Sequence, residues 1–130
     1  MSGQSVEVSV VIPLLNEQDN IRALYAQLNQ ALNGVHDYEL IFIDDGSTDD
    51  SFKILSELHK ADAKVRVIRF RKNFGQTAAL SAGFAHSQGQ IIIAIDADLQ
   101  NDPADIPQMI EQLHKGYDVV SGWRKKRHDN

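Results

Sequence analysis

The chain has 130 residues, 42% hydrophobic and 24% charged, with a formal net charge of −5 and no cysteine. This length fits one domain with a real core, and the acidic balance argues against a nucleic-acid-binding protein, which would usually be basic. The lack of cysteine excludes disulfides and thiolate metal sites, and we see no membrane-span-length apolar stretch and no signal peptide.

Strand-like and helix-like segments alternate along the sequence. Short apolar, β-branched runs predict strands at residues 6–15, 38–43, 65–70, 91–95 and 117–121. Helical spacing or runs of small residues predict helices at residues 21–32, 52–58, 76–87 and 103–114, and Asn16 or Asp19 is expected to cap the first of them. Such alternation predicts an α/β fold with right-handed crossovers and a mostly parallel sheet covered on both faces.

The most informative stretch is IIIAIDADLQN at residues 91–101. Its apolar run predicts a strand buried on both faces, and Asp96 and Asp98 follow it at a spacing that points both to one side. Two such close carboxylates require a counter-charge, and Mg²⁺ or Mn²⁺ takes carboxylate oxygens while leaving positions for phosphate oxygens. The pattern predicts a site for a metal and a phosphorylated ligand. The alternative is an ordinary strand end before the turn and helix start that Asn-Asp-Pro signals at residues 101–103.

Parallel sheets bind ligands beyond the carboxyl ends of their strands. Three polar stretches follow predicted strands and are expected to meet there, at residues 13–17, 44–45 and 96–100. We interpret Asp45 as an acceptor for a base or ribose hydroxyl, whereas Asp44 is equally suited to cap the next helix. Glu17 could bind the ribose, or could be an exposed acid in the first turn of a helix. Pro13 and Leu15 would form a wall for a flat base.

The remaining site candidates concern phosphate. Asp98 is our expected metal ligand, with Gln100 as a neutral oxygen ligand, and Asp96 would reach the sugar or ribose or orient the site. Arg124 would neutralise a departing diphosphate or bind an incoming phosphate. The basic run at residues 125–127 is either a solvated surface or an attachment to anionic lipid.

Five motifs carry a resemblance to a known family. They are VSVVIPLLNE at residues 8–17, IDDGSTDDS at 43–51, RKNFGQTAAL at 71–80, IDADLQNDP at 95–103 and GYDVVSGWR at 116–124. Because it carries these motifs in this order, the chain resembles the family 2 glycosyltransferases of the GT-A fold. It is most similar to those that transfer mannosyl, glucosyl or related sugars to dolichol or undecaprenyl phosphate.

The resemblance implies a GT-A, Rossmann-like, three-layer fold. It implies inverting transfer of a sugar from a UDP- or GDP-linked donor to a polyprenyl phosphate, with Mg²⁺ or Mn²⁺, at the cytoplasmic face of a membrane. Carried over by motif, the nucleoside would contact Pro13, Leu15, Glu17, Ile43 and Asp45. The sugar-diphosphate would contact Asp96, Ala97, Asp98 and Arg124, and the metal Asp98 and Gln100. Leu15 departs from the family, which often has Tyr at this position.

The resemblance also implies that residues 1–130 are the donor-binding part of a longer glycosyltransferase domain. Family members usually continue with an acceptor-binding segment and membrane-associated helices, so we expect a fragment that binds the donor and transfers sugar poorly or not at all. A different class remains as an alternative, the phospho-acceptor receiver domain. That fold needs a Lys at the end of its fifth strand, where residues 122–124 are Gly-Trp-Arg, and an acidic pair after its first strand.

Overall fold

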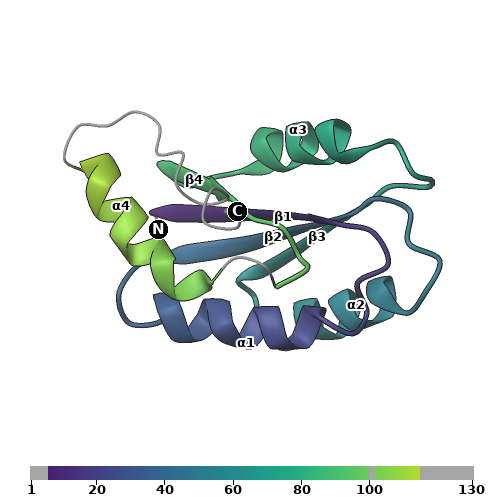
Figure 1. Ribbon diagram of the computed structural model, residues 1–130, viewed down its shortest axis with the longest axis horizontal. Coiled ribbons are helices and arrows are strands. Elements are labelled where there is room, and N and C mark those ends of the chain that lie inside the picture. Colours follow the sequence, from purple (N-terminus) through teal and green to yellow (C-terminus); the bar gives the residue numbers. More distant parts are fainter. Residues whose placement is uncertain (1–5, 100–101, 115–130) are drawn as a thin grey trace, which may run out of the picture.

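A computed structural model describes residues 6–99 and 102–114 of the chain. Strands and helices alternate, as the sequence predicts, and Figure 1 shows their arrangement. The elements are β1 (Val8–Leu14), α1 (Ile21–Leu32), β2 (Tyr38–Asp44), α2 (Ser51–Ala61), β3 (Val65–Arg69), α3 (Gln76–His86), β4 (Ile91–Ala94), the short 3₁₀ helix η1 (Pro103–Asp105) and α4 (Ile106–His114). The strand predicted at residues 117–121 lies outside the described residues.

The four described strands form one parallel sheet in the order β3-β2-β1-β4. Val10 of β1 stands beside Leu40 of β2 and Ile93 of β4, which gives the register. Helices α1 and α2 cover one face of the sheet and α3 covers the other, so the domain has three layers (Figure 1). The predicted α/β fold with a parallel sheet is confirmed. Because every strand runs the same way, the loops that follow the strands meet at one edge.

The two central strands are buried at every position, which explains their nearly continuous apolar runs. On the α1 and α2 side they form the larger core, which also takes in Ile106 and Ile110 of α4. On the other side α3 approaches the sheet closely, because a Cβ on Gly83 would lie 2.3 Å from Cγ1 of Val11. The small residues of α3 therefore allow close packing on β1 and β2.

Strand β4 differs from the prediction of a strand buried on both faces. Ile93 is 3% exposed, but Ile92 is 42% exposed. Within the described residues β4 is the edge strand next to β1, and Ile92 and Ala94 pair with Ser9 and Val11, on the face that carries α3. Since α3 packs over β1 and β2, that side of β4 is left partly uncovered by the described residues.

Candidate functional site

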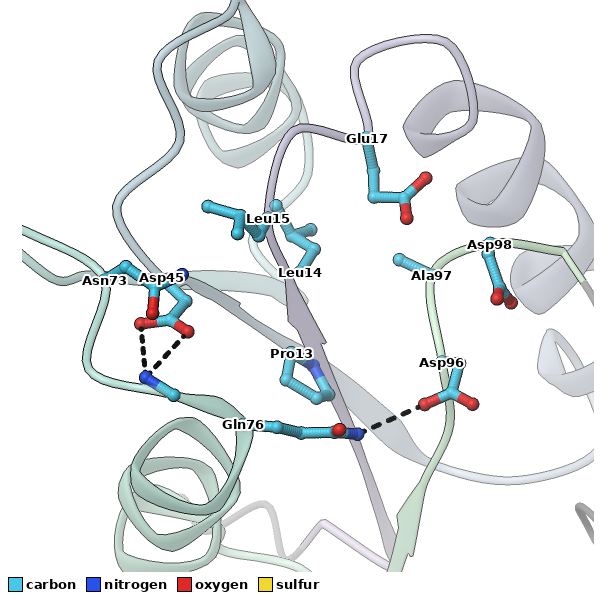
Figure 2. Close-up of a pocket in the computed structure, with 11 residues that line it drawn as sticks. Pro13, Leu14, Leu15, Glu17, Asp45, Asn73, Gln76, Asp96, Ala97 and Asp98 are labelled. Atoms are coloured by element: carbon cyan, nitrogen blue, oxygen red, sulfur yellow. Dashed lines mark hydrogen bonds between the residues drawn. The ribbon is translucent and has the colours of Figure 1, made fainter.

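A pocket of about 530 Å³ opens at the carboxyl edge of the sheet (Figure 2). It lies where β1, β2 and β4 end and α3 begins, so strand ends and one helix start supply its walls. Its lining residues are Pro13, Leu14, Leu15, Glu17, Asp45, Asn73, Gly75, Gln76, Asp96, Ala97 and Asp98. The three polar stretches that the sequence places after separate strands are thus brought together around one cavity.

Most of the site residues expected from the sequence line this pocket. They are Pro13, Leu15, Glu17, Asp45, Asp96, Ala97 and Asp98. Ile43 does not line it, because its side chain is fully buried beneath α3 with Val11, Ile41 and Ala79. Gln100 and Arg124 lie outside the described residues, so their expected roles stay predictions.

One wall is built from two loops that are hydrogen-bonded to each other. The loop between β1 and α1 donates the N–H of Asn16 to Ser47 Oγ (2.8 Å) and the N–H of Glu17 to Ser51 Oγ (2.9 Å). In return the Asn16 side-chain oxygen accepts the N–H groups of Thr48 (2.8 Å) and Asp49 (3.2 Å). The expectation that Asn16 or Asp19 caps α1 is wrong, because the cap position is Asn20 and its side chain makes no capping hydrogen bond.

The acidic pair after β2 divides into two roles. Asp44 is fully buried, and its Oδ1 accepts the N–H of Ser47 (2.8 Å), so it shapes the turn rather than capping the helix. Asp45 lines the pocket and accepts the N–H groups of Phe74 (2.8 Å) and Gly75 (3.1 Å). These bonds hold the loop after β3 against the pocket and bring Asn73 into its lining.

Gly46 makes this close approach of the two loops feasible. Its φ of 87° lies in the left-handed region, and a Cβ there would stand 2.5 Å from the carbonyl carbon of Lys72. A side chain at this position would push the loop after β3 away from Asp45. Backbone contact, and not only the Asp45 carboxylate, therefore positions Asn73.

The opposite wall is the acidic turn after β4. Ala97 packs into the core and is 3% exposed, while Asp96 is half-buried and Asp98 is exposed. Both carboxylates line the pocket, although Ala97 and Asp98 lie in a turn and not in the extended chain to which the spacing argument applies. Figure 2 shows the amide of Gln76, the first residue of α3, reaching across to Asp96, with Nε2 3.4 Å from Oδ1. Leu99, at φ 64°, then turns the chain away from the strand direction.

Sequence reasoning did not assign a role to Asn73, Gly75 or Gln76, although it singled out their motif, RKNFGQ. Topology was the signal that could have found them. They follow β3, so in a parallel sheet they must reach the same edge as the three acidic stretches.

Carboxylates dominate the electrostatics of the pocket, whose lining includes Glu17, Asp45, Asp96 and Asp98. Their negative charges favour a cation or a ligand that brings one. Asp96 and Asp98 offer hard oxygen atoms of the kind that Mg²⁺ and Mn²⁺ prefer, and Asp98 is exposed enough to reach an ion in the cavity. Within residues 6–99 and 102–114 there is no cluster of three His, Asp or Glu side chains suited to a metal.

A nearby acid is held in its charged form by the loop contacts. Burial by itself would raise the pKa of Asp49, but hydrogen bonds from Ser51 and from the N–H of Gln18 outweigh burial and lower the pKa below its usual value. Asp49 thus remains a charged acceptor that supports the contact between the two loops.

The fold and the pocket together define an α/β domain with an acidic site at the carboxyl edge of a parallel sheet. The chain matches the family described as glycosyl transferase family 2 over residues 9–130, and it belongs to that family. This membership removes the receiver-domain alternative. Across the described residues no helix is both long enough and apolar enough to cross a membrane.

Several known proteins are similar to the chain. Undecaprenyl-phosphate 4-deoxy-4-formamido-L-arabinose transferase from Klebsiella pneumoniae (strain 342) is 44% identical over 126 residues, covering 95% of this chain and 38% of that protein. Glucosyl-3-phosphoglycerate synthase from Mycobacterium tuberculosis, in a crystal structure with Mn²⁺, UDP and glucosyl-3-phosphoglycerate, is 29% identical, with a TM-score of 0.66 over 88% of this chain and 42% of its own.

A third protein shows the fold alone. TarS from S. aureus, in complex with UDP, is 18% identical, with a TM-score of 0.71 over 84% of this chain and 32% of its own. The chain spans less than half the length of each of these three proteins.

Proposed function

We propose that residues 1–130 form the donor-binding part of an enzyme that transfers a sugar, with inversion, from a UDP- or GDP-linked donor to a polyprenyl phosphate. One observation carries the proposal. The pocket joins a wall of Pro13, Leu15, Glu17 and Asp45 to the acidic turn at Asp96 and Asp98. A nucleotide sugar has the same order of parts, with an uncharged nucleoside at one end and a diphosphate-linked sugar at the other.

In this assignment the nucleoside lies against the wall formed by the β1–α1 loop and the β2–α2 loop. Pro13 and Leu15 offer apolar surface to the base, and Leu15 is 41% exposed and accessible to it. Asp45 has both oxygens on backbone N–H groups, and a carboxylate has further lone pairs with which to accept a base N–H. Glu17 would accept a ribose hydroxyl. Ile43, whose side chain packs in the core, would support this wall from within.

The sugar-diphosphate would lie along the acidic turn. Asp98 and Gln100 would hold Mg²⁺ or Mn²⁺, and Asp96 and Ala97 would contact the sugar. When bound, the cation would supply positive charge to the diphosphate leaving group. Arg124 would add a second positive charge there. The first turn of α3, which contains no acidic residue, begins beside this part of the pocket.

The chemistry requires little from the protein beyond positioning. A phosphate monoester is already anionic near neutral pH, so the attacking oxygen needs no strong general base. It would approach the anomeric carbon from the face opposite the diphosphate, which inverts the configuration. Asp96 would orient the sugar for that approach. We infer that acceptor binding, and attachment at the cytoplasmic face of a membrane, depend on parts of the whole protein beyond this pocket.

Two relatives support the ligand classes. The Klebsiella protein is named for an undecaprenyl-phosphate acceptor, and the mycobacterial synthase was crystallised with Mn²⁺ and UDP. Both exceed a quarter identity with this chain, and we infer a shared donor-binding arrangement from this similarity.

Calorimetric titration tests the proposal. UDP-glucose, UDP-N-acetylglucosamine and GDP-mannose are titrated into the chain with and without Mn²⁺, and into the Asp98→Ala variant. We expect at least one donor to bind in a Mn²⁺-dependent manner. In Asp98→Ala the affinity for that donor should fall about 100-fold. Glu57→Ala, which removes an acid on the exposed side of α2, is the control and should bind normally. Wild-type affinity in Asp98→Ala with Mn²⁺ present would show that the metal assignment is wrong.

A further inference from the structure

The contact between the β1–α1 loop and the β2–α2 loop centres on Asn16, a residue that does not line the pocket. Its two neighbours in the chain, Leu15 and Glu17, do line it. The Asn16 side chain instead bonds to Thr48 and Asp49, more than thirty residues away in the sequence. Asp45, the other proposed nucleoside contact, lies three residues before Thr48 in the partner loop. Asn16 therefore joins the two stretches that would face the nucleoside.

The backbone at Asn16 is as unusual as its hydrogen bonds. Its φ is 55°, and one other described non-glycine residue, Leu99, has a positive φ. Asn tolerates this left-handed conformation better than most residues, because its short polar side chain bonds locally. Here the carboxamide oxygen accepts two backbone N–H groups, while the Asn16 N–H donates to Ser47. A single residue thus supplies both the turn in the chain and several of the hydrogen bonds between the loops.

We propose that Asn16 is a positioning residue for the nucleoside, which sets the spacing between the Leu15–Glu17 stretch and Asp45 before the ligand arrives. This inference rests on the proposed function, since it concerns the same pocket. The physical reason is preorganisation. When only a fraction of molecules has the loops correctly spaced, the apparent Kd rises in inverse proportion to that fraction. Loss of the Asn16 acceptor would remove two of the hydrogen bonds that hold the loops at this spacing, so the fraction of molecules with correctly spaced loops would fall.

The chain provides a matched control at Gln18. Like Asn16, it is exposed, and its side-chain oxygen accepts a backbone N–H across the same pair of loops, that of Asp50 (2.9 Å). Gln18 does not line the pocket, and it lies on the far side of Glu17 from Leu15. Gln18→Ala therefore removes one backbone-donated hydrogen bond between the same loops, against two for Asn16→Ala, without changing the residue between the two lining positions.

The experiment compares Asn16→Ala, Asn16→Asp and Gln18→Ala with the wild-type chain. UDP and GDP are titrated in the presence of Mg²⁺, and magnesium pyrophosphate is titrated separately because it would occupy only the acidic turn. We expect Asn16→Ala to lower the affinity for the nucleotide that binds the wild type by about tenfold. Its affinity for pyrophosphate should not change. Asn16→Asp keeps an acceptor and tolerates the backbone, so it should bind within about threefold of wild type, as should Gln18→Ala.

Thermal unfolding followed by circular dichroism shows whether the variants are folded. If Asn16→Ala does not fold, Asn16→Gly takes its place, since glycine adopts the positive φ without strain and still lacks the acceptor.

Three results would overturn the inference: an unchanged nucleotide affinity in the variant without the acceptor, an equal loss for nucleotide and pyrophosphate, or an equal loss in Gln18→Ala. A wild-type chain that binds neither UDP nor GDP would instead overturn the proposed function, and this inference with it.

Discussion

The two ends of the sheet use carboxylates in opposite ways. Near the amino ends of the strands, Glu39 is 3% exposed, and its oxygens accept hydrogen bonds from Ser9 Oγ (2.6 Å), the N–H of Gln88 (2.7 Å) and Arg66 Nη1 (2.8 Å). At the carboxyl ends, Asp96 is half-buried and Asp98 is exposed, and both face a cavity. A buried acid that accepts hydrogen bonds from protein donors, one of them the Arg66 guanidinium, stabilises the fold. Acids at an open cavity are instead available to bind a ligand.

The Glu39 cluster also explains how four segments meet. Ser9 lies on β1, Glu39 on β2 and Arg66 on β3, while Gln88 precedes β4. Burial by itself would raise the pKa of Glu39, but the Ser9, Gln88 and Arg66 contacts outweigh it and lower the pKa below its usual value. The comparison predicts that stability and ligand affinity can be changed separately from the two ends of one sheet.

The largest expected effect is on stability, from Glu39→Ala. This change leaves the Ser9 hydroxyl, the Gln88 N–H and the Arg66 guanidinium without their shared acceptor. We expect a loss of about 3 kcal/mol in the free energy of unfolding, at the lower end for a broken buried pair because Arg66 is partly exposed. Urea denaturation measures it. Nucleotide-sugar affinity of the folded fraction should not change, and a selective loss of affinity would contradict the division between the two ends.

A smaller effect, on binding instead of stability, is expected from Asp96→Ala. The variant removes a proposed sugar contact from the pocket edge, so donor affinity should fall about 30-fold. The free energy of unfolding should stay within about 0.5 kcal/mol, because the carboxylate lies at the half-exposed rim of the cavity. Calorimetry and urea denaturation of the same preparation give both values. A stability loss as large as that of Glu39→Ala would show that Asp96 is a structural acid.

Gln76→Ala tests how much the contact between Gln76 and the acidic turn contributes to donor binding, and the expected effect is modest. Its amide lies 3.4 Å from Asp96, a long hydrogen bond, so its removal should weaken donor binding only about threefold. Gln76→Glu is the informative companion. It adds a fifth acid to the pocket beside Glu17, Asp45, Asp96 and Asp98. It should therefore weaken donor binding more in the absence of Mn²⁺ than in its presence. Equal losses with and without Mn²⁺ would contradict this reading of the charges.

The smallest expected effect is the response of the Glu39 cluster to acid. A depressed folded-state pKa means that ionised Glu39 stabilises the fold above the unfolded-state value of about 4.3, and that this contribution is lost as the pH falls through the folded value. Only the ionisation is lost, so packing and some hydrogen bonds remain.

Urea denaturation at about pH 7 and about pH 3 should show less acid destabilisation in Glu39→Gln than in the wild type. Asp49 and Asp62 also have lowered pKa values and will contribute in both proteins. Parallel pH profiles for the two proteins would exclude Glu39 as a source of the acid sensitivity.

The sequence by itself determined the parallel α/β fold and most of the pocket. Apolar runs of strand length, separated by helical segments, lead to parallel crossovers, and that topology sends every residue after a strand to one edge. The order of strands and helices along the sequence was therefore sufficient to predict that Glu17, Asp45, Asp96 and Asp98 meet at the same cavity.

Only the tertiary structure decided the relations between loops and between layers. It showed that Asn16 bonds across to Thr48 and Asp49 instead of capping α1, and that Asp45 holds the backbone before α3. It also showed that Ile43 faces the core and that Ile92 is partly uncovered. The physical reason is that hydrogen bonds and burial depend on which segments come close together in space. The spacing of residues along the chain does not specify which segments do so.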